Sequence, residues 1–348
     1  MIPETMAKLS AGEHLTYDEM RGAVSEILDG RSSVLQTTEF LRRLTAKGET
    51  DGELVAMLDS MQEHAIHIEP RCSGKVIDVC GTGGDRMRTF NVSTTAAFVV
   101  AAAGVNVAKH GNRSSSGISG SADIFEHFGY DLGMEPQRVR EIIERFRIGF
   151  MFAQKFHPAM KNVAEARKAV GGRTAFNLLG PLSNPARVTS QLVGVFSPEY
   201  LKRVVGILQS RGAEDVITAI SEDGLDELSV TSKNRLCHLR GGEVHEFVLD
   251  PTEIGLSRAS LDDIQVSTRE EAILAFVHAL DGTGKKATIE ITALNAAAAL
   301  VVGGKASNIK EGLETSIQTM KSGKAFDLLK NFIKHCGDIG KIEELEKN

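Results

Sequence analysis

Three of the four residues Gly81-Thr82-Gly83-Gly84 are glycines, and Asp85 follows them. The cluster lies between a short β-branched run, Val76–Cys80, and an apolar stretch with helical spacing. Glycines let the backbone turn sharply and bring several N–H groups close to an anion, and the following helix adds the positive end of its dipole. The pattern is neither a P-loop nor a Rossmann fingerprint. We predict a phosphate-binding turn here, and a tight turn without a ligand is the alternative.

Hydroxyl and amide side chains follow at the start of that helical stretch, at Asn91, Ser93, Thr94 and Thr95. One of them would be enough to cap the helix. The others can offer oxygens to a phosphate or to its metal ion. We therefore expect this end of the helix to belong to the same site as the glycine cluster.

A basic loop follows the second predicted strand. It reads Lys109-His110-Gly111-Asn112-Arg113 and leads through serines and glycines to Ser121. Because the carboxyl ends of neighbouring parallel strands meet at one edge of a sheet, this loop and the glycine cluster are expected to share a site. Four cations fall within residues 86–113 of a chain whose net charge is negative. We interpret them as part of a polyanion site, and an exposed basic loop is the alternative.

Four carboxylates fall within six residues, at Glu222, Asp223, Asp226 and Glu227. The adjacent pair Asp226-Glu227 supplies hard oxygen ligands suited to Mg²⁺, which binds few protein carboxylates and completes its shell with water and phosphate. An acidic turn without a metal is the alternative, and the phosphate site expected nearby favours the metal. By contrast, His157 indicates little by itself, because a histidine before a proline usually packs or caps.

The elements that would position these residues fall into two groups. The first 70 residues or so show only helical spacing of apolar residues. From Lys75 onward, short strands alternate with helices, and a hairpin turning on Gly241-Gly242 adds antiparallel pairing. The predicted fold class is therefore α/β, with a small all-helical domain and a larger α/β domain whose mixed, mostly parallel sheet is flanked by helices. Among the expected elements are helices over Tyr17–Leu28, Thr37–Ala46, Asp51–Ala65 and Ser93–Ala103, a helix opened by Ser197-Pro198, and a strand over Asp215–Ser221.

Composition excludes several classes of protein. The 348 residues include 46 acidic and 40 basic side chains, a formal net charge of −6, which argues against a surface built for nucleic acid or anionic membrane. The longest nearly uninterrupted apolar run, Ala96–Val105, is about half of a bilayer span. Met1–His14 lacks the apolar core of a secretory signal. Four scattered cysteines without a C-x-x-C pair argue against zinc and disulfides. We expect a cytoplasmic protein that binds neither nucleic acid nor membrane.

Together these segments resemble the anthranilate phosphoribosyltransferase family, within the nucleoside phosphorylase-like phosphoribosyltransferases. The similarity covers nearly the whole chain, and its motifs occur in the family's order. They are GTGGD with TFN-x-ST (Gly81–Asp85, Thr89–Thr94), KHGNR with SGSAD (Lys109–Arg113, Ser119–Asp123), HPAM (His157–Met160), GRT-x-FN-x-LGPL-x-NPA (Gly172–Ala186) and GLDEL (Gly224–Leu228).

The resemblance implies transfer of the phosphoribosyl group of 5-phosphoribosyl 1-diphosphate (PRPP) to the amine of anthranilate, with release of pyrophosphate, in tryptophan biosynthesis. It also implies Mg²⁺ as a cofactor and a homodimer formed through the helical domain. The helical domain would comprise residues 1–72 and a returning segment of about 167–185, and the α/β domain residues 73–166 and 186–348. We expect no covalent nucleophile and no essential base, because orienting the neutral amine and stabilising the leaving pyrophosphate suffice.

The family's site residues carry over by motif. Mg²⁺ is assigned to Ser93, Asp226 and Glu227. The residues assigned to anthranilate are His110, Asn112, His157 and Arg167. The planar fork of Arg167 would face the carboxylate of anthranilate. The residues assigned to PRPP are Gly81, Thr82, Gly84, Asp85, Thr89, Asn91, Ser93, Thr94, Lys109, Asn112, Arg113 and Ser121.

Two departures from the family pattern stand out. Arg86 and Arg88 replace a frequent glycine and a small polar residue or lysine, and Ile118 replaces a frequent lysine of the serine-rich loop. A phosphate contact missing at Ile118 would have to come from elsewhere, such as Arg113. Two alternatives share the architecture: a pyrimidine nucleoside phosphorylase-type enzyme, and a non-catalytic relative that binds nucleic acid. The negative net charge and the pair Asp226-Glu227 argue against the second.

Overall fold

The computed structural model describes residues 2–83, 87–114 and 118–345. The chain divides into two compact units, a helical unit formed by Met1–His67 and Ala153–Arg187, and an α/β unit formed by Ile68–Phe152 and Val188–Asn348. The stretch that returns to the helical unit begins earlier than the range of about 167–185 expected from the sequence. Phe156 already contacts the end of the first helical segment, since its O accepts a hydrogen bond from Ile66 N at 2.8 Å. No helix in the described ranges is long and apolar enough to cross a membrane.

Three helices of the helical unit begin with the same arrangement. The side chains of Thr16, Ser33 and Thr50 each accept a hydrogen bond from the backbone N–H three residues later. The Glu or Gln side chain at that later position accepts a hydrogen bond from the backbone N–H of the cap residue. The returning stretch packs on these helices, and Asn162 Nδ2 donates to Leu28 O at 2.8 Å. The elements are α1 (Ile2–Ser10), α2 (Tyr17–Leu28), α3 (Val34–Lys47), α4 (Asp51–Glu63), α8 (Ala153–Phe156), η1 (Pro158–Met160), α9 (Lys161–Val170) and α10 (Ala175–Leu182).

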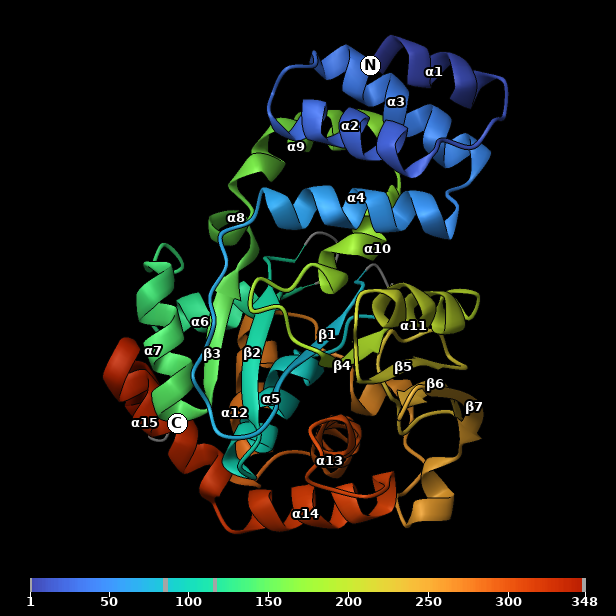
Figure 1. Cartoon of the computed structure of the whole chain (residues 1–348). Coiled ribbons are helices and arrows are strands. Elements are labelled where there is room, and N and C mark those ends of the chain that lie inside the picture. The colour runs from blue at the N-terminus through green and yellow to red at the C-terminus, as the bar shows by residue number, and fades with distance from the viewer. Residues whose placement is uncertain (1, 84–86, 115–117, 346–348) are drawn as a thin grey trace. The chain divides into compact units, whose positions relative to one another are not determined.

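The α/β unit contains a seven-stranded sheet in the order β3-β2-β1-β4-β5-β6-β7 (Figure 1). Strands β1 to β5 are parallel, and β6 and β7 are antiparallel, so the sheet is mixed and mostly parallel, as predicted. The hairpin between β6 and β7 turns on Gly241 and Gly242, whose φ values of +60° and +84° suit a tight two-residue turn. The strands are β1 (Val76–Gly81), β2 (Asn106–Gly111), β3 (Ile148–Phe152), β4 (Ser190–Gly194), β5 (Asp215–Ser221), β6 (Asn234–Arg240) and β7 (Glu243–Leu249).

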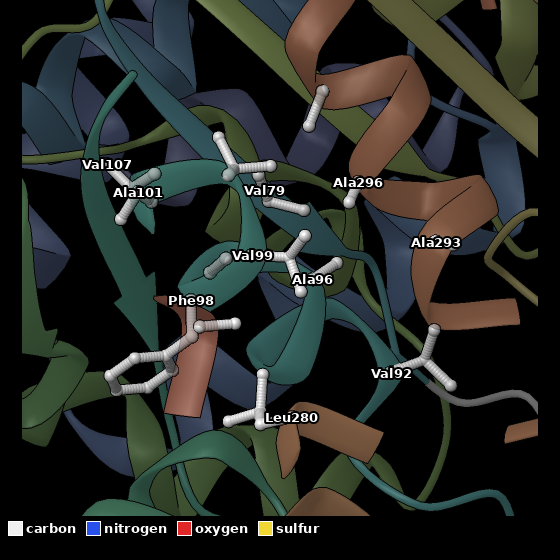
Figure 2. Close-up of a cluster of buried hydrophobic side chains, with 14 of the residues drawn as sticks. Val79, Val92, Ala96, Phe98, Val99, Ala101, Val107, Leu280, Ala293 and Ala296 are labelled. Carbon is white, nitrogen blue, oxygen red and sulfur yellow. The ribbon is translucent and has the colours of Figure 1, made fainter. Parts of the chain in front are cut away.

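Two apolar helices form the centre of the core of this unit. In α13 almost every residue is buried, because the helix packs against both α5 and α14. Figure 2 shows Val92, Ala96 and Val99 of α5 in the same cluster as Ala293 and Ala296 of α13. The helices are α5 (Val92–Ala102), α6 (Ser121–His127), α7 (Pro136–Phe146), α11 (Tyr200–Ser210), α12 (Arg269–Asp281), α13 (Lys286–Val302), α14 (Ile309–Lys321), α15 (Lys324–Cys336) and α16 (Gly340–Leu345), with short 3₁₀ turns η2 (Pro251–Ile254) and η3 (Leu261–Asp263).

Candidate active site

The glycine cluster follows the carboxyl end of β1, in contact with the ends of two other parts of the chain. Thr82 N donates to Gly194 O at 2.9 Å, at the end of the neighbouring strand β4. Gly83, whose φ is +68°, donates from its N to Asp226 Oδ2 at 2.6 Å. Gly84 and Asp85, which we assigned to PRPP, and Arg86 lie outside the described residues. The described part of the loop is therefore held by a strand and by an acidic loop that comes more than 140 residues later.

The acidic pair contacts both the glycine loop and the start of α5. Besides the bond from Gly83 to Asp226, Glu227 Oε1 accepts a hydrogen bond from Ser93 N at 3.0 Å. Asp226 is only 6% exposed. The structure thus brings together Gly83, Ser93 and both carboxylates, from three segments that are far apart in the sequence.

Two glycines on adjacent strands make room for Asp226. An ideal Cβ at Gly81 would lie 2.7 Å from Asp226 Oδ2, and one at Gly194 only 1.4 Å from Asp226 O. Gly81 and Gly194 are register partners in β1 and β4. Gly194 is not among the site residues predicted from the sequence. The signal was present, because a single glycine inside an apolar strand pattern often marks the close approach of another backbone.

Lys109 is an internal cation beneath the start of α5. Its Nζ donates to Val79 O at 2.7 Å and to Ser93 Oγ at 3.4 Å, and the residue is 2% exposed. Burial lowers the pKa of Lys109, and the negative charges of Asp78 and Glu227 oppose the shift. Through its two hydrogen bonds, the buried Lys109 side chain links β1 at Val79 to Ser93 at the start of α5.

The other residues of the loop after β2 differ in exposure. His110 is 7% exposed, and its backbone N–H donates to Asp78 Oδ1 at 3.3 Å. Asn112 is exposed, and its Oδ1 accepts from Arg113 N at 2.8 Å. Ser121 Oγ donates to Asn112 O at 3.4 Å, which ties the loop to the start of α6. These bonds fix the loop backbone.

Arg113 forms a two-pronged ion pair with Glu126 of α6. Its Nη1 and Nη2 each lie 2.6 Å from an oxygen of that carboxylate. These hydrogen bonds raise the pKa of Arg113, although the guanidinium is 42% exposed. The predicted PRPP contact at Arg113 therefore requires a side chain that an acid engages in this structure.

Two side chains between β1 and α5 present oxygens that have no partner among the described residues. Thr82 Oγ1 and Asn91 Oδ1 are buried and have no hydrogen-bond partner in the described part of the chain. The Asn91 amide nitrogen is engaged, since Nδ2 donates to Ser119 O at 3.0 Å. Thr94 is 1% exposed. Thr89 forms an isolated antiparallel bridge with Gln265. Buried oxygens of this kind normally have a partner, so they mark a place where a ligand or water completes the structure.

Two of the residues assigned to anthranilate, His157 and Arg167, belong to the helical unit. Burial lowers the pKa of His157 to about 4, because the charged imidazole loses its hydration. The histidine is therefore neutral at pH 7. The guanidinium of Arg167 lies over the ring of Phe176 at 5.9 Å, and none of the described carboxylates pairs with it. Burial lowers the pKa of Arg167, but a guanidinium remains charged at neutral pH.

Asn295 of α13 is a further residue that sequence reasoning did not assign. Its Oδ1 accepts from Leu228 N at 3.0 Å, and its Nδ2 donates to Leu228 O at 2.7 Å. The Asn295 side-chain amide thus satisfies both backbone groups of Leu228, as the main chain of an adjacent strand does in a sheet. Because Leu228 follows Glu227 directly, Asn295 fixes the acidic loop. The signal was a lone amide in an apolar, alanine-rich helix.

Comparisons with known proteins agree on one family. Two family models match, "Glycosyl transferase family, helical bundle domain" over residues 3–65 and "Glycosyl transferase family, a/b domain" over residues 73–326. The anthranilate phosphoribosyltransferase of Nitrosopumilus maritimus (strain SCM1) is 56% identical over 345 residues, 99% of each chain. That of Geobacillus kaustophilus (strain HTA426) is 40% identical over 329 residues, 94% of this chain and 96% of the relative.

Solved structures give the same result. The crystal structure of anthranilate phosphoribosyltransferase from Thermus thermophilus superposes with a TM-score of 0.87 at 38% identity, covering 94% of this chain and 98% of that one. The enzyme of Saccharomyces cerevisiae in complex with PRPP and Mg, with a TM-score of 0.86 at 24% identity over 96% of this chain and 97% of that one, supports the fold. The resemblance noted in the motifs is confirmed, and the chain belongs to the anthranilate phosphoribosyltransferase family.

Proposed function

We propose that this protein transfers the phosphoribosyl group of PRPP to the amino group of anthranilate and releases pyrophosphate. The observation that carries the proposal is the position of Asp226 and Glu227. Each carboxylate accepts a hydrogen bond from a different phosphate-binding element, Asp226 from Gly83 N and Glu227 from Ser93 N. A diphosphate held by those elements would lie beside two acids that can carry its counter-cation.

The glycine loop and the start of α5 would hold the diphosphate of PRPP. Thr82 Oγ1 and Asn91 Oδ1, which have no partner among the described residues, could accept bonds from the ribose hydroxyls or from bound water. Lys109 contributes its positive charge from inside, through Ser93. This arrangement supports the PRPP assignments made for both loops.

The donor set fits Mg²⁺. Asp226, Glu227 and the Ser93 hydroxyl are hard oxygen donors, as that ion prefers. Within residues 2–83, 87–114 and 118–345, no three His, Cys, Asp or Glu side chains lie close enough to hold a metal by themselves. A Mg²⁺ ion held here would complete its shell with substrate phosphate and water. When bound, it would neutralise charge on the departing pyrophosphate.

The reaction breaks the bond between ribose C1 and the diphosphate oxygen and forms a bond between C1 and the anthranilate nitrogen, which loses a proton. Arg167 would bind the carboxylate of anthranilate with its planar fork. His157, neutral at pH 7, would contribute packing and one hydrogen bond without a charge. The amine needs chiefly to be oriented, so we assign no residue as an essential base.

A homodimer formed through the helical unit is also proposed. Tyr17, Val34 and Leu35 of α2 and α3 are 44%, 40% and 71% exposed, and they are large apolar side chains. Val34 and Leu35 adjoin at the start of α3, and a second chain packed there would cover them. Sedimentation equilibrium tests the dimer, and the mass of a single chain would contradict it.

A cytoplasmic location is also proposed. The four free cysteines are consistent with a reducing compartment of this kind.

The activity test is direct. Purified protein is incubated with PRPP, MgCl₂ and anthranilate, and the loss of anthranilate fluorescence is followed together with release of pyrophosphate. We expect both signals, and we expect EDTA to abolish them. Phosphorolysis of a pyrimidine nucleoside in place of this transfer would instead support the phosphorylase alternative.

A further inference from the structure

The segment Ile264–Arg269, which leads into α12, contacts the chain beside both of the proposed PRPP loops. Thr89 and Gln265 form an antiparallel bridge, and Val266 N donates to Arg88 O at 2.7 Å. These bonds hold Arg88 and Thr89, which lie between the glycine cluster and α5. None of the family motifs quoted above includes this segment, which lies far from both loops along the chain.

The same segment reaches the loop after β2 through Arg269. The guanidinium Nη2 donates to Asp123 O at 2.9 Å and lies 3.4 Å from Asp123 Oδ1. This short segment therefore contacts two places. Its backbone contacts Arg88 and Thr89 before α5, and the Arg269 side chain contacts Asp123 after the loop that follows β2.

Asp123 in turn holds both flanks of the serine-rich loop. Its Oδ2 accepts hydrogen bonds from Gly120 N at 2.8 Å and from Ser114 N at 3.2 Å. The two flanks are in close contact, since an ideal Cβ at Gly120 would lie 2.3 Å from Ser114 N. The Asp123 side chain is only 13% exposed, so these charge-assisted bonds are partly shielded from water.

Arg113, the other arginine near Asp123, makes different contacts from Arg269. Arg113 is bound at 2.6 Å by both oxygens of Glu126. Its Nη1 lies 3.5 Å from Asp123 Oδ1, about as far as Nη2 of Arg269 lies, but none of the contacts among the described residues joins it to the main chain of Asp123. Arg269 lies 3.8 Å from the same Glu126. Arg269 is thus the cation that contacts both the main chain and the carboxylate of Asp123.

We propose that Arg269 is a positioning residue for PRPP: it orients Asp123 and, through Asp123, the loop after β2. The adjacent backbone of Gln265 and Val266 holds the glycine loop, so the two loops keep one spacing. The proposal rests on the proposed function and adds a residue to it that the family motifs quoted above do not include.

The test compares three single variants. Arg269→Gln removes the charge, Arg269→Lys restores it without the fork, and Arg258→Gln is the control because Arg258 forms a similarly exposed pair with Asp250 at 2.6 Å. For Arg269→Gln we expect the KM for PRPP to rise about fivefold, with the KM for anthranilate and the melting temperature unchanged. Arg269→Lys should recover part of the loss, because an ammonium cannot match the fork. The control should behave as the unmodified protein.

Two further measurements separate this role from a general loss of structure. In the double variant with Asp123→Asn, Arg269→Gln should add nothing to the effect of Asp123→Asn, because both changes break one chain of contacts. Hydrogen exchange in the ligand-free protein should become faster at the amides of Ser114 and Gly120. Additive effects, an equal rise in both KM values, or an unchanged KM for PRPP would overturn the proposal.

Failure of the proposed function would look different. If the unmodified protein transferred no phosphoribosyl group, the assigned activity would be wrong. The hydrogen-exchange comparison would still decide whether Arg269 holds the loop, because it uses no substrate. Unchanged exchange at Ser114 and Gly120 in Arg269→Gln would overturn the inference in that case as well.

Discussion

Gly194→Ala should damage the site through a single methyl group. The new Cβ would begin 1.4 Å from Asp226 O, whereas Cβ contacts below 3.0 Å essentially never occur. The two groups must therefore separate by about 1.6 Å, the difference between these distances. The obstacle is backbone, so no side-chain rotation can relieve it.

The cost follows from what the shift breaks. The bonds from Gly83 N to Asp226 and from Ser93 N to Glu227 involve charged acceptors, each worth about 1.5–3 kcal/mol. Misplacing a reacting group by about 1 Å can cost on the order of 100-fold in rate. We expect kcat/KM for PRPP to fall at least about 100-fold, which corresponds to about 2.7 kcal/mol.

The assay is anthranilate fluorescence at saturating Mg²⁺, with thermal unfolding measured in parallel. Gly81→Ala gives a graded comparison, because its Cβ would meet the end of the Asp226 side chain at 2.7 Å, and we expect a smaller loss. Gly206→Ala in α11 is the matched control. Apart from its chain neighbours and its own helix backbone, no atom of the described residues lies within 4 Å of a Cβ at this position. The substitution should therefore stabilise the helix by about 0.5–1 kcal/mol and leave activity unchanged. A Gly194→Ala enzyme within twofold of the unmodified one would refute the reasoning.

Three further predictions concern buried polar groups. Burial lowers the pKa of His157 to about 4 in the native protein, against about 6.5 in the unfolded chain, so between pH 7 and pH 5 only the unfolded chain takes up a proton. The free energy of unfolding should therefore fall by about 2 kcal/mol from pH 7 to pH 5. Guanidinium unfolding of His157→Gln should lack this part of the pH dependence. Lys47→Met leaves the Glu53 carboxylate, which is 0% exposed, without its cation at 2.8 Å; urea unfolding should show a loss of about 3 kcal/mol, and an unchanged midpoint would contradict this. Asn295→Leu leaves Leu228 N and O unsatisfied, so we expect a lower melting temperature and a weaker apparent affinity for Mg²⁺, measured by titrating activity; equal values would disprove the positioning role.

Sequence patterns predicted the elements whose signals are local. Tyr17–Leu28 and Asp215–Ser221 have the predicted bounds. In the first, a capping box and apolar spacing act together, and in the second, every residue of a short strand is buried. The prediction that Ser197-Pro198 opens a helix was wrong, because α11 begins at Tyr200 and Ser197 Oγ donates to Glu199 Oε1.

Two kinds of feature could not be predicted: a turn whose residue type gives no signal, and contacts between segments distant in sequence. Strand β3 follows α7 without a glycine or proline between them, and the chain turns at Arg147 in the left-handed region, φ 60°. Arginine has no preference for the left-handed region, so its position gives no signal of this turn. The glycine loop was recognisable from its own composition. The roles of Gly194 and Asn295 were not, because each serves a loop located elsewhere in the chain.

The composition of the helical unit has a consequence for synthesis on the ribosome. Its first four helices are made before any of the α/β unit, but α9, which packs against α3, emerges only after three strands of the sheet. Until then, Leu28 O lacks the Asn162 amide, and the apolar face of α3 lacks its cover. The nascent chain therefore carries an incomplete bundle while residues 68–152, 85 residues in all, are translated. An N-terminal fragment expressed alone would expose the same surface.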